Sequence, residues 1–261
     1  MGRIIAFANQ KGGVGKTTTC VNMASYMALL GKKVLIVDLD SQGNATTNLG
    51  FEKNGKHNSV YQVMSGDVDI DKCIYDTKID NLKIIPSNLD LSGIEVELVY
   101  MEKREFVIKN YLEKIKNNYD YITIDCPPSL GLLTVNAFTA SDAVIIPVQC
   151  EFFALEGLSQ LMNTIRLVKK RLNSNIAIDG VVLTMRESRS NLGRQVADEI
   201  KNFFATTVFE TQIPRNVRLA EAPSYGEPIC LYDKSCGGAK AYLKLTQEYF
   251  DRNNIDYIKK I

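Results

Sequence analysis

Short apolar runs alternate with longer amphipathic stretches along most of this chain. Residues 3–8 form an apolar run suited to a buried strand, and residues 17–30 carry apolar side chains at helical spacing without Gly or Pro. This pairing recurs toward the C-terminus. Further strands are predicted at 33–38, 82–86, 119–125, 143–148, 177–184 and around 208–213. Helices are predicted at 59–64, across 89–117 as one or two long helices, and at 154–172, 191–204 and 237–250.

The alternation of strands and helices is typical of a parallel sheet, because parallel neighbours need a crossover connection. The first strand, helix and second strand follow one another at the spacing of a right-handed crossover. No linker, repeat or low-complexity segment interrupts the pattern, and 261 residues suffice to bury a full core. We therefore expect one α/β domain over residues 1–261, with a doubly wound, mostly parallel sheet and helices on both faces.

A glycine-rich segment separates the first strand from the first helix. Residues 9–18 read Asn-Gln-Lys-Gly-Gly-Val-Gly-Lys-Thr-Thr. Three glycines within four residues, followed by a helix N-terminus, let backbone N–H groups converge on an anion. In such a P-loop, Lys16 reaches the β- and γ-phosphates and the Thr17 hydroxyl binds Mg²⁺. The sequence therefore predicts a phosphate site made of Gly12, Gly13, Val14, Gly15, Lys16, Thr17 and Thr18.

A second lysine, Lys11, precedes the glycines. The general pattern G-x-x-x-x-G-K-[ST] asks for glycine where this chain has Gln10. A lysine this early in an inward-wrapping loop has difficulty reaching the phosphates of its own site. An outward-pointing ammonium is instead suited to nucleotide held by another subunit, and a solvated loop charge is the alternative.

Three acidic residues follow the strands predicted near this loop. Asp38 and Asp40 lie at and just beyond the end of strand 33–38, where open α/β sheets place their active sites. Asp125 ends strand 119–125 in the arrangement of a Walker B motif, so its carboxylate is expected to hold Mg²⁺ directly or through water. Asp38 is suited to support the metal, and Asp40 to orient an attacking water. The alternatives are that Asp38 and Asp40 only cap the next helix, and that Asp125 is an ordinary strand-end carboxylate.

Composition narrows the class of protein. The net charge is +1, but residues 166–261 hold 16 Lys and Arg against 11 Asp and Glu, so basic side chains gathered there would favour an anionic partner. Six cysteines without a C-x-x-C pair, and no signal peptide, indicate a reduced, cytoplasmic protein rather than a zinc or iron–sulfur protein. The lone histidine, His57, lies in a polar stretch, so imidazole catalysis is not expected. No apolar segment reaches the ~20 residues of a membrane span.

These motifs resemble those of the deviant Walker A ATPases, the ParA/MinD family, and in particular its ParA/Soj branch. The similarity runs along nearly the whole chain and is carried by residues 11–18, 38–44, 124–131, 147–151 and 213–218. It implies a slow, Mg²⁺-dependent ATPase that forms a homodimer around ATP. In that dimer Lys11 reaches the partner's nucleotide, Asp40 serves the hydrolytic water, and Pro214 and Asn216 line the adenine pocket. The alternative for Pro214 and Asn216 is that they only form a turn before a strand. Ser41 stands where the family usually has proline, so this loop loses some stiffness.

The resemblance also implies a biological role and partners. ATP dimers of this branch bind double-stranded DNA nonspecifically, through arginines that match Arg189 and Arg218, and a ParB-type centromere-binding protein stimulates hydrolysis and release. This predicts a nucleoid-associated switch in chromosome or plasmid segregation. From the residues alone, a solvated rim is the simpler interpretation of these arginines. Because the phosphate loop begins at residue 9, an N-terminal helix-turn-helix domain is not expected.

A MinD-like membrane-cycling ATPase is the alternative function. It requires a C-terminal amphipathic helix, and residues 249–261 place Phe250, Tyr257, Ile258 and Ile261 near one face. Two asparagines interrupt that face, and Asp251 and Asp256 would repel anionic lipid. We therefore expect a packed terminal helix and no stable membrane insertion. A reductase related to the nitrogenase iron protein would need a symmetric cysteine pair for a shared cluster.

Overall fold

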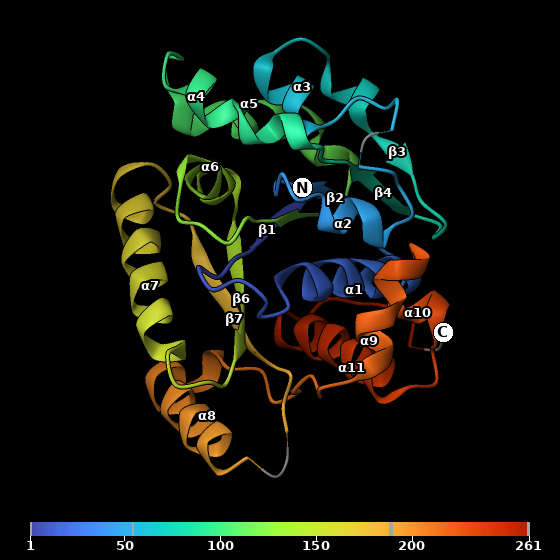
Figure 1. Ribbon diagram of the computed structural model, residues 1–261, viewed down its shortest axis with the longest axis vertical. Helices are drawn as coiled ribbons and strands as arrows, with labels where there is room; N and C mark the ends of the chain where they lie inside the picture. The colour runs from blue at the N-terminus through green and yellow to red at the C-terminus, as the bar shows by residue number, and fades with distance from the viewer. Residues whose placement is uncertain (1, 54, 188–189, 260–261) are drawn as a thin grey trace.

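The structure, a computed structural model, describes residues 2–53, 55–187 and 190–259 (Figure 1). Within these ranges a seven-stranded sheet has the order β3-β4-β2-β5-β1-β6-β7. Every neighbouring pair is parallel except the antiparallel edge pair β3 and β4. This confirms the predicted mostly parallel sheet. Its strands are β1 (Arg3–Phe7), β2 (Val34–Asp38), β3 (Tyr75–Asp76), β4 (Leu82–Ile85), β5 (Tyr121–Asp125), β6 (Ala143–Gln149) and β7 (Ala177–Thr184).

Helices cover both faces of the sheet, and each face has its own apolar core (Figure 1). One face holds α3 (Val60–Ser65), α4 (Ile94–Leu98), α5 (Val107–Ile115), α6 (Leu132–Ala140), α7 (Ala154–Arg171) and α8 (Asn191–Phe204). The other holds α1 (Lys16–Leu29), α2 (Asn44–Asn48), α10 (Ile229–Tyr232) and α11 (Gly237–Arg252), with α9 (Val217–Glu221) packed on α10 and α11. The doubly wound α/β architecture is therefore confirmed.

The order of the strands decides which acids meet. β5 lies between β1 and β2, so the strand that ends in Asp38 does not pair with the strand that leads into the phosphate loop. Instead, Asp38 of β2 is in register with Asp125 of β5, which is in register with Phe7 of β1. The sheet therefore places the two carboxylates on adjacent strands beside the phosphate loop.

Residues 89–117 form short helices, so the prediction of one or two long helices was wrong. The region divides into η2 (Leu89–Ser92), α4, η3 (Arg104–Phe106), α5 and η4 (Lys116–Asn118). Gly93 separates η2 from α4, and Lys103 adopts a left-handed φ of 52° before η3. The apolar spacing nevertheless predicted the buried side correctly, since these residues are in the core: Leu91, Ile94, Leu98, Ile108, Leu112 and Ile115.

The strand predicted around 208–213 is also absent from the described residues. That segment follows β7 through two isolated bridges, Val208 with Val181 and Pro214 with Arg186, and through the N–H groups of Phe209 and Ile213, which donate to β7 carbonyls at 2.9 Å. Between them, the backbone N–H groups of Glu210 and Thr211 donate to the carboxylate of Glu248 on α11, at 2.7 and 2.9 Å. A side chain therefore takes the hydrogen bonds that a strand ladder would need. The other short helices are η1 (Ile70–Cys73), η5 (Ala205–Thr207) and η6 (Ala222–Tyr225).

The C-terminal tail packs on the body of the protein, as predicted, but without the predicted helix. α11 ends at Arg252, and the Ile258 N–H donates to the carbonyl of Leu30 at 3.2 Å. The Tyr257 and Phe250 rings lie 5.4 Å apart. Over the ranges that the structure describes, no helix has both the length and the apolar character of a membrane span.

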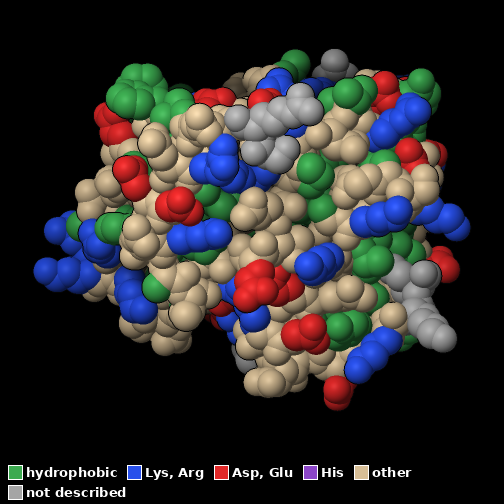
Figure 2. All heavy atoms as spheres, turned by 90° about the horizontal axis from the view of Figure 1, so that it is seen from below, with side chains coloured by type: hydrophobic (Ala, Val, Ile, Leu, Met, Phe, Trp, Pro, Cys, Tyr) green, Lys and Arg blue, Asp and Glu red, His purple; other side chains and the backbone are tan. Residues whose placement is uncertain are grey.

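Charge is mixed on the face seen from below Figure 1. Figure 2 shows Lys and Arg side chains spread over this face with Asp and Glu side chains among them. The excess of basic residues in the second half of the chain is therefore not gathered into one uniform basic surface in this view.

Candidate nucleotide-binding site

The phosphate loop crosses from β1 to α1 in a conformation that glycine adopts easily. Gly13 and Gly15 have φ of 74° and 86°, and Gly15 directly precedes α1. The Asn9 amide donates to the carbonyl of Pro147 on β6 at 2.8 Å. The Thr184 hydroxyl on β7 donates to the carbonyl of Val14 at the same distance. The loop is therefore anchored at the ends of two strands, with the N-terminus of α1 facing it.

The two lysines of the loop have different surroundings. Lys16 is only 7% exposed, and its ammonium donates to the carbonyl of Lys11 at 3.1 Å. Burial lowers the pKa of Lys16, and the charges of Asp125 and Asp40 oppose this effect. The Lys11 ammonium instead pairs with Glu151, just beyond β6, and both side chains are partly exposed. Lys16 thus lies within the loop, whereas Lys11 reaches out of it at the surface.

Asp38 and Asp125 form a buried pair of carboxylates. Both are fully buried, and Asp38 accepts hydrogen bonds from the backbone N–H and hydroxyl of Thr46, at 2.8 and 2.7 Å. Neither carboxylate oxygen of Asp125 has a hydrogen-bond partner in the described part of the chain. Burial raises the pKa of Asp38 to about 6. Burial, followed by the charge of Asp38, raises the pKa of Asp125 well above its usual range.

These donors fit Mg²⁺ bound together with nucleotide. Mg²⁺ prefers oxygen ligands and is usually held by one or two carboxylates, water and substrate phosphates. The unpartnered oxygens of Asp125 and the hydroxyl of Thr17, at the start of α1, supply such donors. Asp38 is engaged by Thr46, so it is placed to support Asp125 rather than to replace it. No group of three or more His, Cys, Asp and Glu side chains that could hold a metal occurs among the residues described.

Asp40 lies in the hollow beside the loop. It is 7% exposed and lines a cavity of about 380 Å³ together with loop residues, Thr47 and Pro128. Its carboxylate accepts a hydrogen bond from the backbone N–H of Gln42 at 3.0 Å, within its own turn. The alternative for Asp38 and Asp40 was that both only cap the next helix. Asp38 does contact that helix, through Thr46 of α2, whereas Asp40 contacts the Gln42 N–H within its own turn.

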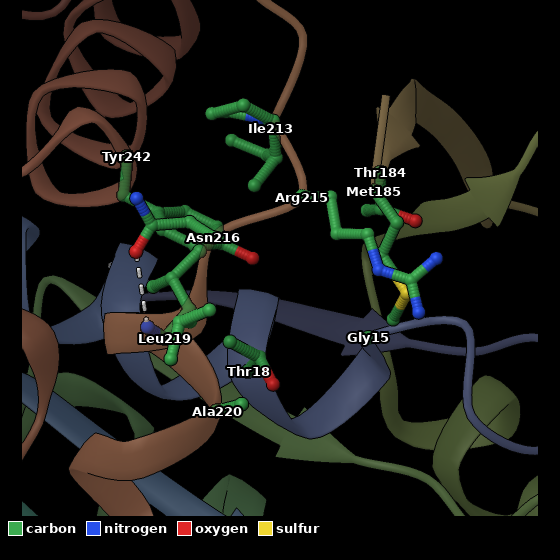
Figure 3. Close-up of a pocket in the computed structure, with 12 residues that line it drawn as sticks. Gly15, Thr18, Thr184, Met185, Ile213, Arg215, Asn216, Leu219, Ala220 and Tyr242 are labelled. Atoms are coloured by element: carbon green, nitrogen blue, oxygen red, sulfur yellow. Dashed lines mark hydrogen bonds between the residues drawn. The ribbon is translucent and has the colours of Figure 1, made fainter. Parts of the chain in front are cut away.

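A second cavity of about 320 Å³ adjoins the first, because Gly15, Thr18 and Met185 line both. Pro214 and Asn216, the residues expected at the adenine, line this second cavity. Figure 3 shows that the side-chain oxygen Oδ1 of Asn216 accepts a hydrogen bond from the backbone N–H of Leu219, at 3.3 Å. This hydrogen bond caps α9. The other walls of this second cavity are largely apolar and include Ile213, Met185, Leu219 and Tyr242. A small apolar slot next to a phosphate loop suits a planar base.

Three residues of the site were missed from the sequence. Met185 follows β7 with a left-handed φ of 49° and lines both cavities. Tyr242 comes from α11, where its hydroxyl lies 3.1 Å from that of Thr19. Glu151 was noticed only as part of a motif, without a role. The position of Met185 at the carboxyl end of a strand was the one available signal.

The predicted DNA-binding arginines are only partly described. Arg218 lies on α9, 55% of its side chain is exposed, and it pairs with Glu221 at 2.9 Å and Asp233 at 3.7 Å. Arg189 lies outside the described residues. Arg186 has an internal role, since its guanidinium donates to Gln212 and to the Gly193 carbonyl.

Comparisons with known proteins agree with this site. The family model described as AAA domain matches residues 2–178. The chain is 57% identical over 248 residues to Sporulation initiation inhibitor protein Soj of Bacillus subtilis, covering 95% of this chain and 98% of that protein. This chain belongs to the ParA/Soj family of partitioning ATPases. The resemblance inferred from the motifs is therefore confirmed.

Further relatives of the ParA/Soj family extend the match over the same length. Chromosome partitioning protein ParA of Caulobacter vibrioides is 48% identical over 252 residues, which cover 96% of this chain and 94% of that protein. Among solved structures, cobyrinic acid a,c-diamide synthase from Mycobacterium smegmatis with bound ADP and magnesium superposes with a TM-score of 0.85 at 33% identity, over the full length of both chains. The likeness thus includes most of β7 and all of α9 and α11, which lie beyond residue 178, where the family model ends.

Proposed function

We propose that ATP joins two copies of this chain into a dimer that binds DNA. Hydrolysis of the ATP then releases the dimer from the DNA. The observation that carries the proposal is the placement of the two lysines. Lys16 lies within its own phosphate loop, whereas the Lys11 ammonium leaves the loop and meets Glu151 at the surface. A lysine so placed is available to phosphates that approach on a second subunit. One ATPase domain over residues 1–261 accounts for these features.

ATP and Mg²⁺ are the cofactors that the site fits. The backbone of residues 12–18 and Lys16 would hold the phosphates, Thr17 and Asp125 would bind Mg²⁺ with support from Asp38, and Pro214 and Asn216 would border the adenine. Mg²⁺ supplies charge neutralisation at the β- and γ-phosphates. Asp40 orients the attacking water, and its hydrogen bond to the Gln42 N–H fixes its carboxylate in the cavity. The reaction converts ATP and water to ADP and phosphate.

Nonspecific DNA binding is assigned to Arg218 and Arg189. Arg218 is exposed on α9, the helix that also supplies Leu219 and Ala220 to the base cavity, so a nucleotide contact lies next to a DNA contact. Its ion pairs with Glu221 and Asp233 are solvent-exposed and therefore weak enough to exchange for a phosphate. A ParB-type protein stimulates hydrolysis, and the chain acts in the cytoplasm on the nucleoid, in segregation of a chromosome or plasmid.

The decisive test is the Lys11→Ala variant. It should bind ATP as a monomer but fail to dimerise in sedimentation-velocity runs with ATP, and its turnover should fall. Lys83→Ala is a matched control, because Lys83 is also a partly exposed lysine in an ion pair, with Asp76 at 3.0 Å. A Lys11→Ala chain that dimerises and hydrolyses ATP like the parent would refute the proposal.

DNA co-sedimentation tests the second half of the switch. The parent should be retained on DNA with ATP and released with ADP, and retention should be lost when Arg189→Glu and Arg218→Glu are combined. Equal retention with the two nucleotides contradicts the switch. Liposome flotation with ATP tests the MinD-like alternative, for which residues 253–259, which are not helical, give no support.

A further inference from the structure

Exposed apolar side chains on α4 and just after it have no role in the nucleotide site. Val96 of α4 is 67% exposed, and Val99 and Tyr100, which follow the last helical residue Leu98, are 55% and 86% exposed. Ile94 and Leu98 of the same helix are buried in the core, so α4 is apolar both inward and outward. Figure 1 shows α4 at the upper left and α9 at the right in the lower half, so α4 is well separated from the helix that carries Arg218. We call the exposed set Val96, Val99 and Tyr100 the α4 surface.

The charge around the α4 surface narrows what can bind it. Residues 89–104, which include the α4 surface, contain the four acids Asp90, Glu95, Glu97 and Glu102 and the two basic residues Lys103 and Arg104, so the segment has a net charge of −2 in a chain whose net charge is +1. Such a surface repels DNA phosphates and anionic lipid headgroups. It complements a peptide segment that carries apolar side chains together with Lys or Arg. Three exposed side chains make a small contact, which suits a transient partner.

A direct contact connects α4 to the turn that follows β5. The Glu95 carboxylate accepts a hydrogen bond from the backbone N–H of Leu133, at 3.2 Å, in the first turn of α6. It also lies against Gly131, where an added Cβ would be 2.6 Å from its oxygen. The short turn from Asp125 to Gly131 contains Pro128, which lines the phosphate cavity. Only Ser129 and Leu130 separate Pro128 from Gly131, so we expect a displacement of Gly131 to reach the cavity wall at Pro128.

We propose that the α4 surface docks a basic, apolar segment of the protein that stimulates hydrolysis, and that Glu95 passes this contact to the turn between Asp125 and Gly131. The inference rests on the proposed partner-stimulated switch. It names the surface that the partner uses and the residue that links this surface to the phosphates.

The test compares Val96→Lys with the parent. Turnover of ATP is measured with DNA and increasing amounts of the purified ParB-type protein from the same organism. Val96→Lys should need at least tenfold more of that protein for half-maximal stimulation, with unchanged basal turnover and DNA retention. Leu167→Lys is the matched control, since Leu167 is an exposed apolar residue of another helix, α7, at 55% exposure. Glu95→Ala should bind the partner like the parent but be stimulated less, and Glu95→Gln, which keeps the acceptor oxygen, should restore most of the response.

The outcomes separate this inference from the proposed function. If Val96→Lys is stimulated at the parent's half-maximal concentration, the docking surface is refuted and the switch stands. If Val96→Lys changes ATP-dependent dimerisation in sedimentation velocity, the surface meets a second copy, which also refutes it. If the parent itself is never stimulated, the proposed switch fails and the docking role fails with it.

Discussion

Asp125→Asn is expected to stabilise the nucleotide-free chain while it removes ATP hydrolysis. Asp125 is fully buried beside Asp38, and neither of its oxygens has a hydrogen-bond partner among the residues described. The variant removes one of two adjacent buried charges and supplies an amide that can donate to Asp38. The same change removes the carboxylate that we assign to Mg²⁺.

The size of the gain follows from the unsatisfied group. A buried polar group without a partner costs about 1–3 kcal/mol. For a chain of this length, each kcal/mol shifts the melting temperature by about 2–4 °C. The gain should be larger at pH 8 than at pH 4, because at pH 8 the unfolded chain has ionised Asp125 whereas burial opposes its ionisation in the folded chain.

Thermal melting with EDTA and without nucleotide measures this effect. Asp120→Asn is the matched control, because Asp120 lies beside the other end of β5 and accepts a hydrogen bond from the Lys33 N–H at 2.7 Å. Its replacement should lower the melting temperature rather than raise it. Adding Mg²⁺ and ATP should stabilise the parent more than Asp125→Asn. If Asp125→Asn melts below the parent at pH 8 in EDTA, the assignment of Asp125 as an electrostatically strained metal ligand is wrong.

Three further outcomes are expected. The unfolding free energy of the nucleotide-free chain should fall as pH rises from about 4 to 6. The reason is that folded Asp38, with its pKa raised to about 6, keeps a proton that the unfolded chain has released. Urea titrations at stepped pH measure this free energy, and a flat profile contradicts the prediction. Gly180→Ala should lower the free energy of unfolding by about 1–3 kcal/mol or more, because the added Cβ would lie 1.9 Å from the Phe209 ring. Gly157→Ala is the control: its added Cβ would meet no neighbouring atom within 4 Å, so it should be neutral or stabilising in thermal melts. Asn216→Ala should lower the free energy of unfolding by about 1 kcal/mol, because it removes the side-chain cap of α9, and it should weaken ATP binding. Asn216→Asp should keep the cap. Equal melting temperatures for the two variants would argue against the cap.

The sequence alone determined the features that depend on neighbouring residues. The phosphate loop was recognisable because Gly13, Gly15 and Lys16 must be close in sequence to wrap one anion. Asp38 and Asp125 were recognisable as acids at strand ends, and the periodic apolar positions of 89–117 marked a buried side correctly. All of these depend on local backbone conformation and on side-chain spacing of 2 or 3.6 residues.

Only the tertiary structure decided which distant segments meet. The insertion of β5 between β1 and β2 brought Asp38 against Asp125, and Glu248 of α11 took the backbone N–H groups that would have made 208–213 a strand. The base cavity joins Gly15, Met185 and Tyr242, which are far apart in the sequence. Such contacts depend on strand order and on competition for hydrogen bonds between remote segments, which no local pattern of residues encodes.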